Sequence, residues 1–126
     1  MIHEAVLGGG FSYVSKIEYS KAAKEHRTFS FNGEYRKANK AYDKLKRIFL
    51  DIQAGTIDKN ILLDLLSNGD PDIESWAAAH LLGLKHETEM AERKLMKIAK
   101  DDSLGMISFN AEMTLKTWKE KGMLVF

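Results

Sequence analysis

The chain has 126 residues, one proline, no cysteine and a formal net charge of +1. This length suits a compact domain with a sizeable core, and the absence of cysteine excludes zinc fingers, iron–sulfur centres, thiol catalysis and disulfides. The first residues lack the basic and apolar regions of a signal peptide, and no stretch approaches the ~18 apolar residues of a membrane span, so we expect a cytoplasmic protein outside the membrane.

The first half of the chain predicts two helices. The first is expected from Ser12 to Phe29 and ends at a turn that contains Asn32 and Gly33, because Asn and Gly tolerate positive φ. Residues 1–10 end in three successive glycines, which a packed helix rarely includes, so we expect a flexible N-terminal arm, or a short strand or turn, there. The second helix is expected from Glu34 to Gln53, with one buried stripe: Tyr35, Ala38, Tyr42, Leu45, Phe49 and Ile52.

Four further helices are expected in the second half, which gives an all-α protein. Paired along the chain, the helices predict a short α-solenoid of about six helices in HEAT-like antiparallel pairs, with residues 11–126 as a single domain. The third helix is expected to start near Thr56 or Asp58 and to end at Asn68. The fourth should be capped by Asp70 and begin at Pro71, and the fifth should begin near Glu87. Ser108 is expected to cap the sixth helix, and Gly122 to end it.

An internal repeat supports the solenoid. When the sequence is shifted against itself by 33 residues, six apolar positions coincide, as expected for a helical hairpin that is used twice. The coinciding pairs are Leu62 with Leu95, Leu65 with Ile98, Ile73 with Met106, Trp76 with Phe109, Ala78 with Ala111, and Leu82 with Leu115.

Three segments resemble a small bacterial family of all-helical, HEAT-like domains of unknown function: residues 34–45, 76–78 and 109–118. The resemblance covers about residues 13–122. Members of that family occur beside polymorphic-toxin and contact-dependent-inhibition genes, where they resemble immunity proteins. The resemblance therefore implies a helical protein that binds a toxin, and it supplies no catalytic residues.

No motif for metal, cofactor or nucleophilic chemistry stands out. The Glu-x-x-His pattern of di-iron bundles is absent, and His26 and His80 lie on apolar stripes, where a core histidine is the expected role. His86 with Glu89 is read as a surface pair at a helix start. The glycines at 8–10 lack the Lys-Ser/Thr of a P-loop. We therefore expect no enzyme activity, no metal, no cofactor and no small-molecule substrate.

Charge is segregated along the chain. Residues 1–50 hold ten Lys and Arg against five Asp and Glu, whereas residues 51–126 hold nine against thirteen. On the expected second helix, a basic ridge could neutralise phosphates, but Tyr35 and Tyr42 are assigned to the buried stripe, which leaves no platform for base stacking. A solvated outer face is the favoured interpretation, and a nucleic-acid partner is not expected. The ridge consists of Arg36, Lys40, Lys44 and Arg47, with Lys37 beside it.

The acidic run after residue 50 supplies the candidate protein-binding residues. Carboxylates could face the basic groove of a nuclease toxin and accelerate association; the competing interpretation is that most of them cap helices. Asp64 is the most diagnostic, because it lies within a helix where capping explains nothing. The candidates are Asp58, Asp64, Asp70, Asp72 and Glu74.

The sequence thus predicts an immunity protein that binds and neutralises a cognate toxin domain, such as a ribonuclease, by covering its active site. Two alternatives stay open at this point: a nucleic-acid-binding protein that uses the basic second helix, and a structural adaptor.

Overall fold

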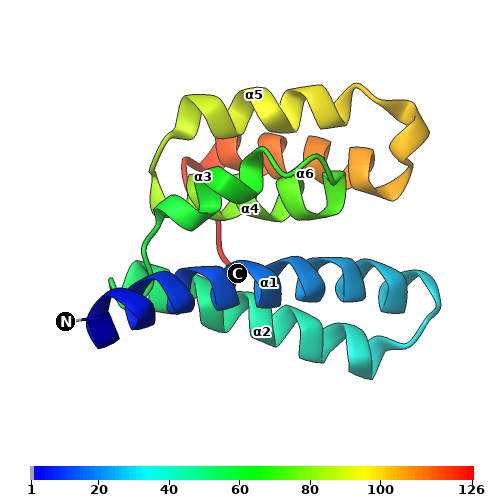
Figure 1. Cartoon of the computed structure of the whole chain (residues 1–126). Coiled ribbons are helices and arrows are strands. Elements are labelled where there is room, and N and C mark those ends of the chain that lie inside the picture. The colour runs from blue at the N-terminus through cyan, green and yellow to red at the C-terminus, as the bar shows by residue number, and fades with distance from the viewer. Residues whose placement is uncertain (1) are drawn as a thin grey trace. The chain divides into compact units, whose positions relative to one another are not determined.

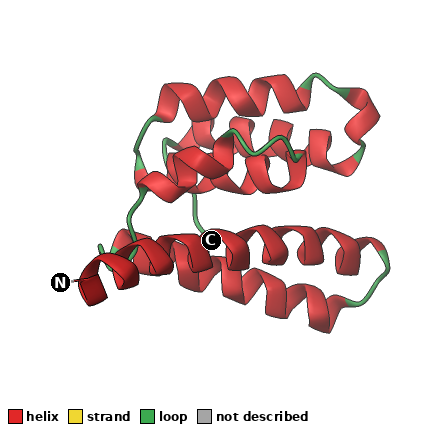
Figure 2. Cartoon of the chain, viewed as in Figure 1, coloured by secondary structure: helices red, strands yellow, loops and turns green. Residues whose placement is uncertain are grey.

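A computed structural model describes residues 2–126, with side chains described from Tyr13 onward. Within residues 2–126 the secondary structure is entirely helical, without a strand (Figure 2), which confirms the all-α class and the six expected helices. No helix in this part of the chain combines the length and apolarity that a bilayer crossing needs. The elements are α1 (Ile2–Phe31), α2 (Tyr35–Gln53), α3 (Asn60–Leu66), α4 (Pro71–Leu84), α5 (Thr88–Ala99), the 3-10 turn η1 (Asp102–Leu104) and α6 (Met106–Lys121).

The chain divides into two compact units, the first ending at Ile61 and the second covering Leu62–Phe126. In the first unit, α1 and α2 form an antiparallel hairpin (Figure 1). The hairpin turns at Gly33, whose φ of +75° is the conformation that the predicted turn requires. The single domain expected over residues 11–126 stays a prediction.

The buried stripe of α2 is confirmed except at its first position. Ala38, Leu45, Phe49 and Ile52 are buried and Tyr42 is half-buried, but Tyr35 is 69% exposed. Tyr35 is the first residue of α2 and lies beside the hairpin turn, so the helical spacing continues to the tip while the covering layer does not. The expectation that Tyr35 is buried is therefore wrong.

The backbone of residues 2–10 also differs from expectation. α1 begins at Ile2 and runs through the three glycines, so this backbone is helical and is not the strand or turn that the glycines also allow. The flexibility of the expected arm stays a prediction. Glycine costs about 1 kcal/mol relative to alanine inside a helix, which disfavours a helix but does not forbid one. A domain boundary at residue 10 stays a prediction.

In the second unit, α4, α5 and α6 pack against one another, and successive helices run in opposite directions (Figure 1). Asp70 caps α4 as predicted, because its Oδ1 accepts a hydrogen bond of 3.0 Å from the Asp72 amide. Gly122 ends α6 with a φ of +67°. Ser108 is not the predicted cap: α6 starts two residues earlier, and the buried Ser108 Oγ donates a 2.8 Å hydrogen bond to the Ala99 carbonyl.

The repeat is visible in burial, but only in part. Four of the six coinciding pairs are buried at both positions. The other two differ: Ile73 is buried and Trp76 half-buried in α4, whereas their counterparts Met106 and Phe109 in α6 are 63% and 53% exposed. The two hairpins therefore share a packing pattern on one face and differ on the other.

Candidate functional site

Two of the five predicted acidic residues act as helix caps. Asp58 lies in the first unit, where its Oδ1 accepts a 2.9 Å hydrogen bond from the Asn60 amide at the start of α3. Asp70 caps α4 in the second unit. The competing interpretation of the acidic run, that its members cap helices, is therefore confirmed for Asp58 and Asp70.

Glu74 is buried inside the second unit. Only 7% of the residue is exposed, and its Oε2 accepts hydrogen bonds from the Gly69 amide at 2.9 Å and from Lys94 Nζ at 3.3 Å. This carboxylate therefore links Gly69, in the turn before α4, to Lys94 on α5. Because a partner protein would have to displace both contacts to reach it, Glu74 is a poor docking residue.

Asp64 and Asp72 keep the accessibility that docking requires. Asp64 is exposed in the middle of α3, and Asp72 is half-exposed in the first turn of α4. The second unit holds eleven Asp and Glu against eight Lys and Arg, a net charge of −3, so both carboxylates lie on an acidic unit. They are the strongest of the five sequence candidates.

An apolar stripe on α6 was missed by the sequence reasoning. Met106, Phe109 and Met113 follow one another at steps of three and four residues and are 63%, 53% and 41% exposed. The repeat pairs Met106 with Ile73 and Phe109 with Trp76. The apolar signal was therefore present, but it was interpreted as part of the repeat and not as a binding surface. Exposed apolar side chains that line up along one helix face are typical of a protein-binding surface.

His80 and His26 lie in packing positions. His80 is 1% exposed, and its ring centroid lies 4.7 Å from that of Phe126 and 5.7 Å from that of Trp76. Burial lowers the pKa of His80 to about 3, so the imidazole is neutral at physiological pH. His26 is half-buried against Tyr42, at 6.4 Å between ring centroids, and burial lowers its pKa as well.

Over the side chains from Tyr13 onward, no three His, Asp or Glu residues gather in a geometry that could hold a metal ion. The role of His80 as a core histidine, predicted from its apolar stripe, is confirmed by its burial.

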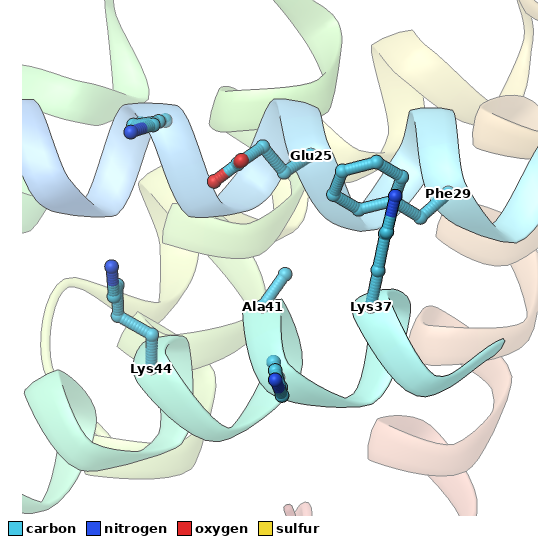
Figure 3. Close-up of a pocket in the computed structure, with 7 residues that line it drawn as sticks. Glu25, Phe29, Lys37, Ala41 and Lys44 are labelled. Atoms are coloured by element: carbon cyan, nitrogen blue, oxygen red, sulfur yellow. The ribbon is translucent and has the colours of Figure 1, made fainter. Parts of the chain in front are cut away.

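A basic groove lies on the first unit between α1 and α2 (Figure 3). It has a volume of about 480 Å³ and is lined by Lys21, Glu25, Phe29, Lys37, Lys40, Ala41 and Lys44. Lys37 and Lys44 extend from α2 toward α1, and Glu25 lies between them on α1. The first unit holds eleven Lys and Arg against seven Asp and Glu, a net charge of +4. The charge segregation read from the sequence therefore coincides with the division into two units.

Sequence and structure were compared with known proteins. No family model, no curated protein and no solved structure matches this chain.

Proposed function

We propose that this chain is an immunity protein of the cytoplasm, which binds a cognate bacterial toxin domain with its second unit and so blocks the active site of the toxin. The sequence resemblance to immunity proteins suggests the class of partner. The observation that carries the proposal is the exposed stripe of Met106, Phe109 and Met113 on α6.

The exposed stripe lies on a helix whose position is set by packing within the second unit. α6 packs against α4 and α5. Trp118 Nε1 donates a 2.6 Å hydrogen bond to Glu92 of α5, and the buried Ser108 Oγ donates a hydrogen bond to the Ala99 carbonyl. A preformed helix face loses little conformational entropy on binding, so its apolar side chains contribute more of their burial to affinity.

The charge of the second unit favours a basic partner. A nuclease domain attracts phosphates with a positive groove, and a unit with a net charge of −3 would be steered toward that groove over longer distances than the apolar stripe can act. The carboxylates that would attract such a partner are those of Asp64, which is exposed, and Asp72, which is half-exposed. A standard interface of about 800 Å² per partner could include both the stripe and neighbouring charges.

Growth rescue tests the proposal. The test takes as its toxin domain the C-terminal domain of a large secreted protein whose gene is found beside the gene for this chain. That domain is co-expressed with the wild-type chain or with a Phe109→Ala/Met113→Ala double variant. Wild type is expected to restore growth, and the double variant to bind the purified domain at least about tenfold more weakly, because apolar anchors at the centre of an interface dominate its affinity.

Met90→Ala is the matched control, since Met90 on α5 is 42% exposed and Met113 is 41% exposed. It should bind the toxin domain as the wild type does. Failure of the wild-type chain to bind or protect would reject the immunity role. If wild type protects and the double variant binds equally well, the α6 stripe is not the docking surface.

A further inference from the structure

Lysine side chains line both sides of the basic groove on the first unit. Lys21 stands on α1, and Lys37, Lys40 and Lys44 stand on α2 at steps of three and four residues. Lys37 is already engaged, because its Nζ lies 3.1 Å from Glu34 Oε1. Among the side chains from Tyr13 onward, the other three lysines take part in no ion pair. Three ammonium groups around one groove are therefore available to an anion.

The acid in the groove does not neutralise these lysines. Glu25 on α1 is the one acid among the described lining residues. It forms no ion pair within the part of the chain whose side chains are described, although Lys21 lies four residues before it at a spacing that permits one. Lys40 and Lys44 are also four residues apart on α2, where like charges repel and destabilise a helix. The groove thus keeps an excess of positive charge that folding alone does not explain.

The groove is open because a small residue lies in the middle of its α2 side. Ala41 is 6% exposed and faces Glu25 across the groove (Figure 3), so a methyl group stands where a longer side chain would fill the space. The volume of about 480 Å³ falls within the range of about 300–1,000 Å³ that is typical of small-molecule sites. The size of the groove therefore suits a small ligand.

The residue types in the groove favour a charge-dense ligand. An arginine guanidinium recognises a planar carboxylate through two parallel hydrogen bonds, but the described lining contains no arginine. A lysine ammonium acts as a compact point charge and binds phosphate in that way. A phosphate monoester carries nearly two negative charges at neutral pH, against one for a carboxylate. Two phosphates can therefore balance the three available lysines, which would take three carboxylates.

We propose that the groove between α1 and α2 binds a small anion that carries two or more phosphate groups, with Lys21, Lys40 and Lys44 contacting the phosphates above Ala41. The site uses none of the residues assigned to toxin binding, which lie in the second unit. The two proposals can therefore fail independently.

Calorimetric titration of the full chain with inorganic tripolyphosphate tests this site, at about 50 mM salt, which screens exposed charges only weakly. We expect one saturable site and an unfolding temperature that rises with tripolyphosphate concentration. Lys40→Gln/Lys44→Gln should weaken binding at least about tenfold, because two charged hydrogen bonds to phosphate are lost. Lys116→Gln/Lys119→Gln is the matched control, since it removes the same charge from exposed positions of α6 in the other unit. It should weaken binding far less.

Two further variants distinguish a groove from a patch of surface charge. Glu25→Gln should tighten tripolyphosphate binding, because it removes the like charge from the lining. Ala41→Leu keeps every charge and fills the groove, so it should weaken binding several-fold if circular dichroism shows that it remains folded. The lysine variants change exposed or half-exposed side chains and test the site even if Ala41→Leu does not fold.

Vesicles distinguish the two sources of clustered phosphates. Sedimentation with vesicles of phosphatidylcholine and phosphatidylinositol bisphosphate, lost in the Lys40→Gln/Lys44→Gln variant, would identify a lipid headgroup. Tripolyphosphate binding without sedimentation would identify a soluble ligand.

Four outcomes would overturn the proposal. The first is no saturable binding of tripolyphosphate. The second is equal or tighter binding of a short polyglutamate peptide of the same charge. The third is an equal loss of affinity in the Lys40→Gln/Lys44→Gln variant and its control on α6. The fourth is binding of an oligothymidylate but not of tripolyphosphate, which would assign the groove to nucleic acid.

Discussion

Trp118 and Glu92 join the last two helices of the chain. The indole Nε1 of Trp118 on α6 donates a hydrogen bond of 2.6 Å to Oε1 of Glu92 on α5, and both side chains are half-buried. A carboxylate acceptor makes this a charge-assisted bond, which is stronger than a neutral one. It holds in place the helix that carries the exposed Met106, Phe109 and Met113.

Removing this acceptor should destabilise the chain. Glu92→Ala is expected to lower the free energy of unfolding by about 1–2 kcal/mol, because it leaves a half-buried indole N–H without its acceptor. Glu92→Gln keeps an acceptor and should lose less. Urea unfolding followed by tryptophan fluorescence measures the change. Glu89→Ala is the control, since the Glu89 side chain is 86% exposed and its 3.8 Å pair with Arg93 lies on the surface. An equal loss in both variants would contradict a specific role for the Trp118 contact.

Glu74 should matter for stability and not for partner binding. Glu74→Ala removes the acceptor of the Gly69 amide and leaves Lys94, which is 23% exposed, without its pair. We expect a loss of about 2–3 kcal/mol in unfolding free energy, because the Gly69 amide loses a charged acceptor and the mostly buried Lys94 loses its ion pair. Chemical denaturation measures this loss, and binding of the toxin domain by the folded variant should be unchanged. A variant of normal stability that binds the toxin domain weakly would reverse the assignment.

His80 should make the stability depend on pH. Its pKa in the folded chain is about 3 against 6.5 for an ordinary histidine, so the unfolded state binds more protons between these values. Above about pH 6.5, His80 is neutral in both states and does not reduce the free energy of unfolding. As the pH is lowered from there toward 3, the free energy of unfolding falls by up to about 1.4 kcal/mol per pH unit. Burial also lowers the pKa of His26, which adds a loss of the same sign.

Denaturation at several pH values between about 7 and 5 measures that slope. His80→Phe removes the titrating group while keeping a ring beside Trp76 and Phe126, so its slope should be shallower even if its stability at neutral pH has changed. Equal slopes in the wild type and the variant would show that His80 does not control the acid sensitivity.

The two halves of α6 should respond differently to truncation. Leu115 is 7% exposed, so Leu115→Ala should cost about 2–4 kcal/mol through the cavity that it leaves. Phe109→Ala removes a larger side chain, but Phe109 is 53% exposed, so unfolding should change by less than about 0.5 kcal/mol. Thermal or urea unfolding of the pair checks this contrast. A large loss for Phe109→Ala would place that ring in the core.

Reversing the accessible acids should act mainly on association. Asp64→Lys with Asp72→Lys should slow the binding of the toxin domain and weaken its dependence on salt, with a smaller effect on dissociation, because long-range charge steers encounter. Stopped-flow or surface-based kinetics at two salt concentrations separates the rates. Lys116→Glu serves as the opposite change on an exposed position of α6 and should accelerate association. An unchanged on-rate would remove the acidic residues from the docking face.

Rules that concern neighbouring residues were enough to predict the class of fold from the sequence. Helical spacing predicted six helices, Asp70 with Pro71 marked the start of α4, and Gly122 marked the end of α6, because propensity, capping and positive φ are properties of neighbouring residues. The stripe of α2 and the burial of His80 followed from the same periodicity. The three glycines at 8–10 predicted a break in the first helix, but α1 runs through them, because the cost of glycine in a helix is small enough to be overcome.

Only the tertiary structure decided which apolar and charged side chains face water. An amphipathic pattern shows that residues share a face, but not whether a neighbouring helix covers it. Tyr35 and Phe109 continue apolar stripes and are exposed, whereas the acidic Glu74 is buried because Gly69 and Lys94 satisfy its carboxylate. The contact between Glu74 and Lys94 joins residues that are 20 positions apart in the sequence. Neither the basic groove nor the α6 surface could be read from residues that are adjacent along the chain.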